Sequence, residues 1–458
     1  MNLSRTKIAS LAAIPAIVCV AASVLHTRRM AAVSMPRVDT RTRAAERVPI
    51  DPQQSAKTIQ CFADRVGRDP QSAINNNLLA AAYLQRCRET GDIADAQRAE
   101  ACARRSLRIR RANNRAGYDE LARSLFTQHR FPEAMTLAAA IAKAAHDDPQ
   151  ALSTLVELET ETGRYDAAAR DLLALQAQPN TEGPYTDALS ARLDEMRGAL
   201  DRSQRLLEAA ADKADESTDL PRENVAWFHF RVGNIRAERG DAAGATQAYY
   251  DALAWYPSDQ KTMLGLAKLE AGENHWRQAI DWATRSAAIV PTPETIALLV
   301  DCCAASGDAA RAAENRLVIE AMRSLSRAQG TVYDRQRALY CADHDVHLDE
   351  ALSLARRELT VRKDVYAYDT LAWVCCRCGR LAEARDASAK AIATGSQDAI
   401  LFYHRGLIDA AMHDDAGARM NLTKALSLNP YFHPTGPRIA REMLQRLDNR
   451  HAGGSYYE

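Results

Sequence analysis

Small and large apolar residues recur at a fixed spacing between residues 366 and 430. Within this stretch they lie three or four positions apart in two blocks separated by a turn, which is the spacing of two antiparallel amphipathic helices. The pattern occurs twice, because Ala384 is followed by Ala418, and Ala391 by Ala425, 34 residues later in each case. Each copy therefore predicts one helix hairpin.

Small residues occupy the positions where the two helices of each hairpin would cross. Ala372 and Gly406 lie in the first blocks of the two copies, and Ala384 and Ala418 lie in the second blocks. Side chains of this size let two helices approach closely. Pro430 is expected to end the last helix, because it has no N–H to donate and clashes with the preceding turn.

The period of 34 residues resembles the tetratricopeptide repeat, or TPR. A large residue, Leu and a small residue in the first block, with Ala and then Pro in the second, are the features that carry this resemblance. Weaker copies can be followed back along the chain, which gives about ten hairpins between residues 73 and 432. The resemblance, which extends to bacterial TPR proteins with a signal or anchor segment, implies an all-α fold: an α-solenoid of about ten TPR-like helix hairpins with an N-terminal signal or anchor helix.

The repeats and the segments between them predict seven parts. An acidic, proline-containing segment separates two stacks of hairpins, and further segments flank them. The expected parts are a signal peptide or membrane anchor (1–26), a flexible basic linker (27–55), an N-terminal TPR-like stack (56–212), a seam loop (213–225), a C-terminal TPR stack (226–432), a capping helix (437–448) and a mobile tail (449–458).

The N-terminal segment has the features of a membrane-targeting sequence. Arg5 and Lys7 precede an uncharged run from Ile8 to Leu25. A basic flank followed by an apolar run is typical of a secretory signal, but this run is also just long enough to cross a bilayer as an uncleaved anchor. We therefore expect a membrane-targeted, exported protein, periplasmic or extracytoplasmic. Cleavage stays open, and the basic flank after the run would favour a cytoplasmic body for an uncleaved anchor.

Charge and motif content limit the functions that are possible. The 59 basic and 59 acidic residues balance, so no net field draws the chain to nucleic acid, and no nucleic-acid partner is expected. The sequence contains no P-loop, G-x-S-x-G, H-E-x-x-H or dinucleotide fingerprint. We therefore expect a protein that is not an enzyme and that holds no cofactor and no metal.

The cysteines leave one alternative open, a metal- or thiol-dependent accessory protein that uses the region from Cys341 to Cys378. Residues 375–378 contain a C-x-x-C motif, and Cys341 and His344 precede it by about one repeat. Against this reading, the motif falls at the end of a first helix, where the negative helix end raises a thiol pKa. Four converging zinc ligands are also not supplied by adjacent turns of one helix. Buried small apolar side chains are the simpler interpretation.

The resemblance points to a partner-binding groove as the functional site. In TPR folds the first helices line the concave face, and positions two, five and nine of each unit point into it. Aromatic residues exposed in a groove are costly unless they meet a partner, although some of them could instead pack between hairpins. Carried over to this chain, the groove positions are Trp227, Phe230, Asn234, Tyr333, Gln336, Tyr340, Tyr366, Asp369, Trp373, Tyr403 and Leu407.

The partner expected for this groove is a protein or peptide, and membrane contact is expected through the N-terminal segment. TPR proteins that clamp chaperone C-termini carry Lys and Asn at set groove positions. Asn234 matches one position, but Phe230, Lys268 and Glu294 stand where that pattern has Lys, Asn and Lys. We therefore predict a non-catalytic scaffold or assembly factor that binds a peptide or protein segment other than a chaperone tail.

One basic concentration accompanies the first repeat. Most such runs are solvated helix faces, but near a membrane tether they can also meet anionic lipid head groups. Its members are Arg98, Arg104, Arg105, Arg108, Arg110, Arg111 and Arg115.

Overall fold

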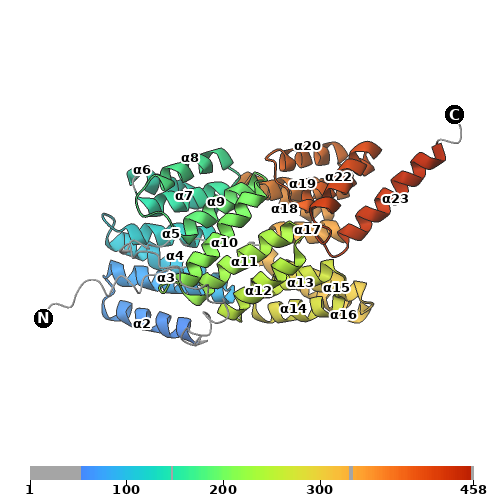
Figure 1. The fold of residues 1–458 in the computed structure, drawn as a ribbon. Helices are drawn as coiled ribbons and strands as arrows, with labels where there is room; N and C mark the ends of the chain where they lie inside the picture. The colour runs from blue at the N-terminus through green and yellow to red at the C-terminus, as the bar shows by residue number, and fades with distance from the viewer. Residues whose placement is uncertain (1–52, 146–147, 330–333, 455–458) are drawn as a thin grey trace. The chain divides into compact units, whose positions relative to one another are not determined.

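The computed structural model describes residues 53–145, 148–329 and 334–454. These residues form twenty-two α-helices and no strand (Figure 1). The predicted all-α class is confirmed. The expected signal or anchor segment (1–26) and the linker up to residue 52 lie outside the described residues. None of the described helices combines the length and the apolar character needed to span a membrane.

Twenty of these helices form ten consecutive antiparallel pairs, as many as the sequence predicts. The first helices of the pairs are α3 (Ala73–Thr90), α5 (Arg115–Thr127), α7 (Pro149–Glu161), α9 (Pro184–Met196), α11 (Arg222–Glu238), α13 (Gln260–Gly272), α15 (Pro293–Ala305), α17 (Asp334–Asp343), α19 (Val365–Arg377) and α21 (Ala399–Ala411). The second helices are α4 (Ile93–Ile109), α6 (Phe131–Ala144), α8 (Tyr165–Gln176), α10 (Leu200–Glu216), α12 (Ala242–Trp255), α14 (Trp276–Ile289), α16 (Ala309–Gln329), α18 (Leu348–Val361), α20 (Leu381–Ile392) and α22 (Asp415–Leu428). Helix α2 (Gln54–Arg68) precedes the pairs and α23 (Gly436–Gly454) follows them.

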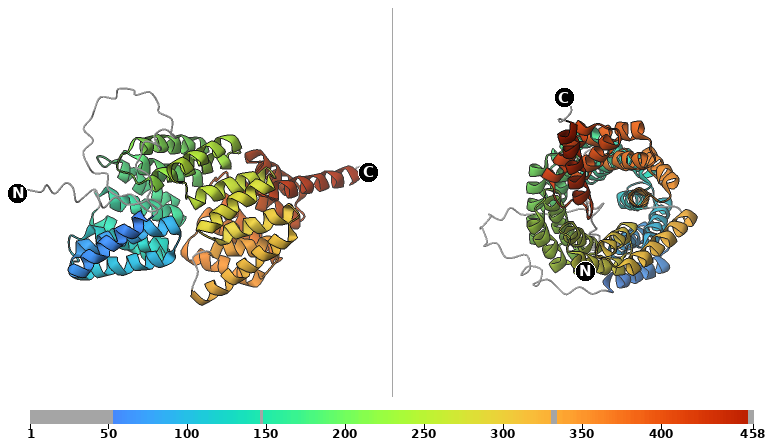
Figure 2. Two further views of the ribbon diagram at one scale, coloured as in Figure 1. Left: turned by 90° about the horizontal axis from the view of Figure 1, so that it is seen from below. Right: turned by 90° about the vertical axis from the view of Figure 1, so that its right-hand side faces the viewer.

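The helices divide into two compact units. Unit 1 contains the chain up to residue 190 together with 206–229 and 251–259, and unit 2 contains 191–205, 230–250 and 260–458. The division passes through α9 to α12 and does not follow the expected stacks. At the expected seam loop (213–225), α10 continues to Glu216 and α11 begins at Arg222, so only residues 217–221 connect them. In the left-hand view of Figure 2 successive hairpins within each unit lie side by side.

Close crossing of the two helices holds each hairpin together. Ala372, Ala384 and Ala418 have no exposed surface. At Gly406 an added Cβ would lie 2.7 Å from Leu422 Cγ, closer than such atoms approach in proteins. The predicted small residues at the crossings are therefore confirmed, and the reason is steric.

Turns within the hairpins need a residue in the left-handed region. Gly379 has φ 73° at the turn between α19 and α20, and Gly240 has φ 74° between α11 and α12. Glycine adopts this conformation without steric cost. His413, one repeat after Gly379, has φ 61° at the equivalent turn. The same backbone turn is therefore kept where the sequence departs from glycine.

Unit 2 is closed by contacts between its early and late hairpins. The Asn429 side-chain amide donates to the Ala237 carbonyl over 2.8 Å, although 192 residues separate them. At Gly198, with φ 79°, an added Cβ would lie 2.0 Å from the Gly395 carbonyl oxygen. Both the backbone conformation and the contact therefore require glycine there. These contacts join the turn after α9, and helix α11, to the turns before and after the last hairpin.

We expect Ala418→Leu to lower the free energy of unfolding by roughly 1–3 kcal/mol, because the added atoms overpack the crossing of α21 and α22. Urea unfolding followed by circular dichroism measures the change. Met420→Leu on the same helix is the control, because Met420 is 65% exposed and its replacement should change stability by less than about 0.5 kcal/mol. Equal unfolding curves for Ala418→Leu and the wild type would contradict the crossing geometry.

A candidate binding face on unit 2

The expected groove aromatics of the last three hairpins lie on first helices but are largely covered. Tyr340 on α17, Trp373 on α19 and Tyr403 on α21 have exposed fractions of 7%, 7% and 5%. Their rings pack against neighbouring hairpins, the alternative that the sequence left open. We call the side chains that α15, α17, α19 and α21 present around these rings the first-helix face.

The other expected groove residues have mixed surroundings. Asp369 is buried, and Tyr333 lies outside the described residues. The remaining members are partly buried, with Trp227 in unit 1 and the others in unit 2: Trp227, Phe230, Asn234, Gln336, Tyr366 and Leu407.

A buried histidine links the last two hairpins. His404 on α21 places Nδ1 2.9 Å from a carboxylate oxygen of Asp369 on α19. Its ring stacks on Trp373 with centroids 4.7 Å apart and planes inclined by 5°. Burial opposes a charge on this ring, but the Asp369 carboxylate and its hydrogen bond outweigh burial and raise the pKa of His404. The arrangement suits a protonated imidazole between a carboxylate and an indole.

Trp373 carries the network on to the preceding hairpin. Its indole Nε1 donates to Asp343 Oδ1 over 2.7 Å. Asp343 is exposed to water at the end of α17. Even so, the surrounding protein disfavours its charge and raises the pKa of Asp343. Three successive first helices, α17, α19 and α21, are thus joined through one chain of polar contacts.

A second carboxylate faces Asp343 from α15. Burial, and then the nearby Asp343 charge, raise the pKa of Asp301 to about 7. His344 Nε2 lies 3.4 Å from Asp301 Oδ1, but burial lowers the pKa of His344 and so disfavours the charged form of this partner. Neither carboxylate forms an ion pair with Lys or Arg among the described residues. The two carboxylates therefore lie near each other on the first-helix face without a Lys or Arg ion pair, and the pKa of each is raised.

The loop after α22 covers one side of this face. Phe432 packs on Tyr403 with ring centroids 5.1 Å apart, and His433 stacks on Tyr403 at 6.5 Å. Burial, together with nearby His404, Lys268 and His344, lowers the pKa of His433 to about 4. His433 is therefore neutral near pH 7.

Tyr366 lies in a second charged region of unit 2. Arg192 and Arg335 each place a guanidinium about 6 Å from its ring, at 6.0 Å and 5.7 Å. Glu238 and Asp398 lie near the same ring, and burial raises the pKa of both carboxyls. This region combines early and late hairpins of unit 2.

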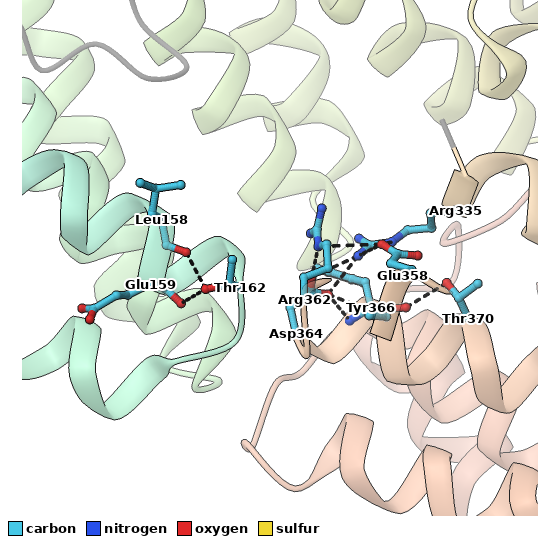
Figure 3. A network of polar contacts seen from close by, with 10 residues as sticks. Leu158, Glu159, Thr162, Arg335, Glu358, Arg362, Asp364, Tyr366 and Thr370 are labelled. Atoms are coloured by element: carbon cyan, nitrogen blue, oxygen red, sulfur yellow. Dashed lines mark hydrogen bonds and ion pairs between the residues drawn. The ribbon is translucent and has the colours of Figure 1, made fainter. Parts of the chain in front are cut away.

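An ion-pair cluster beside Tyr366 ties α17, α18 and α19 together (Figure 3). Arg335 bonds Glu358 at 2.6 Å and Asp364 at 3.0 Å. Asp364 also pairs with Arg362 and accepts the Tyr366 N–H over 2.8 Å, which caps α19. Despite burial, Arg335 and Arg362 lower the pKa of Asp364 to about 2. Because its charged members pair with one another, this cluster is structural.

The cysteines of the alternative site are not suited to thiol chemistry. Cys341, Cys375, Cys376 and Cys378 are all free thiols. Burial raises the pKa of Cys341 to about 11 and that of Cys375 to about 12. A thiolate is the reactive and metal-binding form, so few of these groups are in that form near pH 7.

A group of metal-type ligands occurs elsewhere on unit 2. Glu270, Glu273 and His275 have ligand atoms within 4.8 Å of one another at the turn between α13 and α14, and it is the one such group found in the described part of the chain. It lies outside the region from Cys341 to Cys378. Its members are exposed or only partly buried, as in ordinary surface clusters.

Three residues at the positions of a chaperone-tail clamp, Lys268 and Glu294, which depart from it, and Asn234, which matches it, are paired internally. Lys268 forms an ion pair with Glu294 on the next first helix. Asn234 accepts a hydrogen bond from the Tyr249 hydroxyl over 2.8 Å. These groups are thus already used within unit 2.

Comparison with known proteins finds similarity among solved structures alone. No family description and no curated protein matches the chain. Among solved structures, the APC/C hetero-tetramer Cut9-Hcn1 is similar at 13% identity and a TM-score of 0.33, covering 86% of this chain and 94% of that one. A tetratricopeptide repeat protein from Parabacteroides merdae is similar at 17% identity and a TM-score of 0.32, covering 58% of this chain and 98% of that one.

The chain is a helical repeat protein. This statement rests on its own ten hairpins, because the scores are too low to transfer anything else. Sequence reasoning missed Asp301, His404 and His433. The pairing of His404 with Asp369, 35 residues earlier, could have been found by searching for complementary charges about one repeat apart. The position of His433 could not have been found in this way, because its loop lies outside the repeat.

We expect His404 to make the stability of unit 2 depend on pH. Its pKa is raised in the folded protein, so its contribution is fully present below the pKa of the unfolded state and is lost as pH rises through the folded pKa. The loss of unfolding free energy caused by His404→Gln should therefore be larger at about pH 5.5 than at about pH 8.5. Urea unfolding at both pH values measures it.

His275→Gln is the control for this comparison, because it removes an exposed histidine of the same unit. Its effect should change less with pH. A His404→Gln penalty that is equal at both pH values, or larger at the higher one, would show that the charged ring does not stabilise the fold.

We expect the buried cysteines to resist alkylation in the native protein. Cys61 is exposed and should react quickly, whereas Cys341 and Cys375 should react only after unfolding, because thiolate and access are both lacking. Mass spectrometry of iodoacetamide-treated protein, with and without urea, locates the labelled sites. Rapid native labelling of Cys375 would restore the thiol-dependent alternative.

Proposed function

We propose that unit 2 binds a segment of a partner protein on its first-helix face and that the chain acts as a non-catalytic scaffold or assembly factor. The observation that supports this best is the pair Asp301 and Asp343. Both carboxylates come from first helices and both have a raised pKa. Placing two carboxylates near each other without a direct Lys or Arg ion pair costs folding free energy. A function that uses the charges would explain why the protein keeps this pair despite its unfavourable folding free energy.

A cationic side chain of the partner segment would neutralise these carboxylates. Complementary charge across an interface fixes register and discriminates between partners. Trp373 and Tyr403 lie near one of these carboxylates, because Trp373 bonds Asp343 and Tyr403 lies near the Asp343 charge. We therefore propose a segment with Lys or Arg flanked by apolar residues.

The aromatic residues support this face as its framework. Replacing Tyr340, Trp373 and Tyr403 together by Ala would remove three buried rings, and each large-to-small change in a core costs several kcal/mol. Loss of binding in that variant would therefore not distinguish contact from unfolding. Charge-neutral, size-matched changes at the carboxylates avoid this difficulty.

We also propose that the N-terminal run from Ile8 to Leu25 targets the protein to a membrane, with the body exported. The support is the sequence alone, a basic flank followed by an uncharged run. Fractionation of source cells tests this. Recovery of the whole protein in the soluble cytoplasm would overturn the targeting proposal without bearing on the first-helix face.

We expect Asp301→Asn with Asp343→Asn to release partner proteins while stability stays equal or rises, because removing the repulsion favours the fold. The measurement is affinity capture from an extract of the source cells with quantitative mass spectrometry. Asp281→Asn with Asp386→Asn changes the charge equally on α14 and α20, at exposed positions of second helices, and should retain every partner.

Partners that remain on the Asp301→Asn, Asp343→Asn variant would place binding elsewhere on the chain. Equal loss in both double variants would show that overall charge, and not this face, controls capture. Thermal unfolding of each variant confirms that the folds compared are intact.

A further inference from the structure

The arginines around the first repeat fall into two structural classes. Three have carboxylate partners: Arg98 with Asp95 at 2.6 Å, Arg104 with Glu100 at 2.8 Å and Arg115 with Asp119 at 3.1 Å. The other four are exposed and form no ion pair within the described part of the chain. These are Arg105, Arg108, Arg110 and Arg111.

Helix α2 adds two more arginines at the same end of unit 1. Arg65 and Arg68 are exposed at its C-terminus. The Ser106 hydroxyl of α4 donates to the Ala73 carbonyl over 2.9 Å, and Ala73 begins α3 just after α2 ends. This bond fixes the end of α4 beside the junction of α2 and α3, helices that lie side by side in Figure 1.

The loop that carries two of these arginines is held in place. The Asn114 side-chain amide donates to Ser106 Oγ and to the Arg110 carbonyl, each over 2.8 Å. Its oxygen accepts from Asn77 on α3 over 2.8 Å. Asn114 and Ser106 are both buried. Residues 110–111 lie between them in the chain and are therefore held in place on both sides.

Two carboxylates lie at the same end and leave the arginines unpaired. Asp64 accepts from Gln60 over 2.7 Å, and Asp69 accepts the Gln71 N–H over 3.2 Å. Neither forms an ion pair with an arginine of the described chain. Six arginines against two carboxylates leave a local positive surplus in a chain whose total charges balance.

We propose that this arginine-rich end of unit 1 docks on an anionic lipid surface. Clusters of four to eight Lys or Arg bind acidic lipid head groups, and six arginines meet that requirement. Among the six named positions and their helix ends no exposed aromatic side chain is available for base stacking, because Phe62 is buried. The sequence also carries the uncharged run from Ile8 to Leu25, and stable membrane association takes two signals.

Vesicle sedimentation of the full chain tests the proposal. Binding to phosphatidylcholine vesicles is compared with binding to vesicles that also contain phosphatidylserine, and the ratio cancels the apolar contribution of residues 8–25. Each arginine near an anionic surface is worth about fivefold, so Arg105→Gln, Arg108→Gln and Arg111→Gln together should lower the ratio roughly a hundredfold. Added salt should lower the wild-type ratio, because it screens the charges.

Two further variants make the test specific. The triple change of the same residues to Lys keeps the charge and should keep the ratio. Arg277→Gln, Arg311→Gln and Arg441→Gln remove three exposed arginines of unit 2 and should leave it unchanged. Circular dichroism and thermal unfolding confirm that each variant is folded.

Several results would overturn the proposal. These are an unchanged ratio in the Gln variant of the patch, an equal fall in the unit 2 variant, or a fall in the Lys variant. Binding of a duplex oligonucleotide that depends on the same arginines, without a preference for phosphatidylserine, would assign the patch to nucleic acid instead.

Discussion

Close helix crossing is the constraint on which the rest of this protein depends. At Gly233 an added Cβ would lie 2.3 Å from the Tyr249 ring, and at Gly265 it would lie 2.7 Å from the same ring. One tyrosine thus fits between two successive first helices only because both present glycine. Ala384 and Ala418 play the same part in the last hairpins, with no exposed surface. The spacing that these residues set determines which polar groups of neighbouring hairpins can meet.

Polar contacts between hairpins then follow the repeat. Trp373 reaches Asp343, 30 residues earlier, and His404 reaches Asp369, 35 residues earlier. Arg335 bonds two carboxylates on the following helices. Such contacts join neighbours only, which is the energetic pattern of a repeat protein. Unit 2 departs from this pattern where Asn429 bonds Ala237 across 192 residues, so its early and late hairpins also stabilise each other directly.

Two groups of like charges, one in each unit, do not arise from these contacts between hairpins. In the first-helix face, the packing of α15 and α17 brings Asp301 and Asp343 together. The hydrogen bonds of these two carboxylates do not require them to be close. In unit 1, Arg105 and Arg108 face water while Arg104, between them and Glu100, is neutralised. Folding free energy explains neither arrangement, because like charges at short range oppose it. Surfaces of this kind gain stability when a molecule of opposite charge binds.

The sequence by itself determined the all-α class, the ten hairpins and the small residues at their crossings, because these depend on spacing within a few helical turns. It also indicated which helices would carry the candidate face, through positions such as Tyr340 and Trp373. Only the tertiary structure decided that these rings are covered, that His404 is held by Asp369, and that Arg105 is free while Arg104 is paired. The division into units was also beyond the sequence pattern, since α10 and α11 continue through most of the expected seam. The reason is physical: burial and charge compensation depend on neighbours one or more repeats away, and the repeat pattern does not encode those distances.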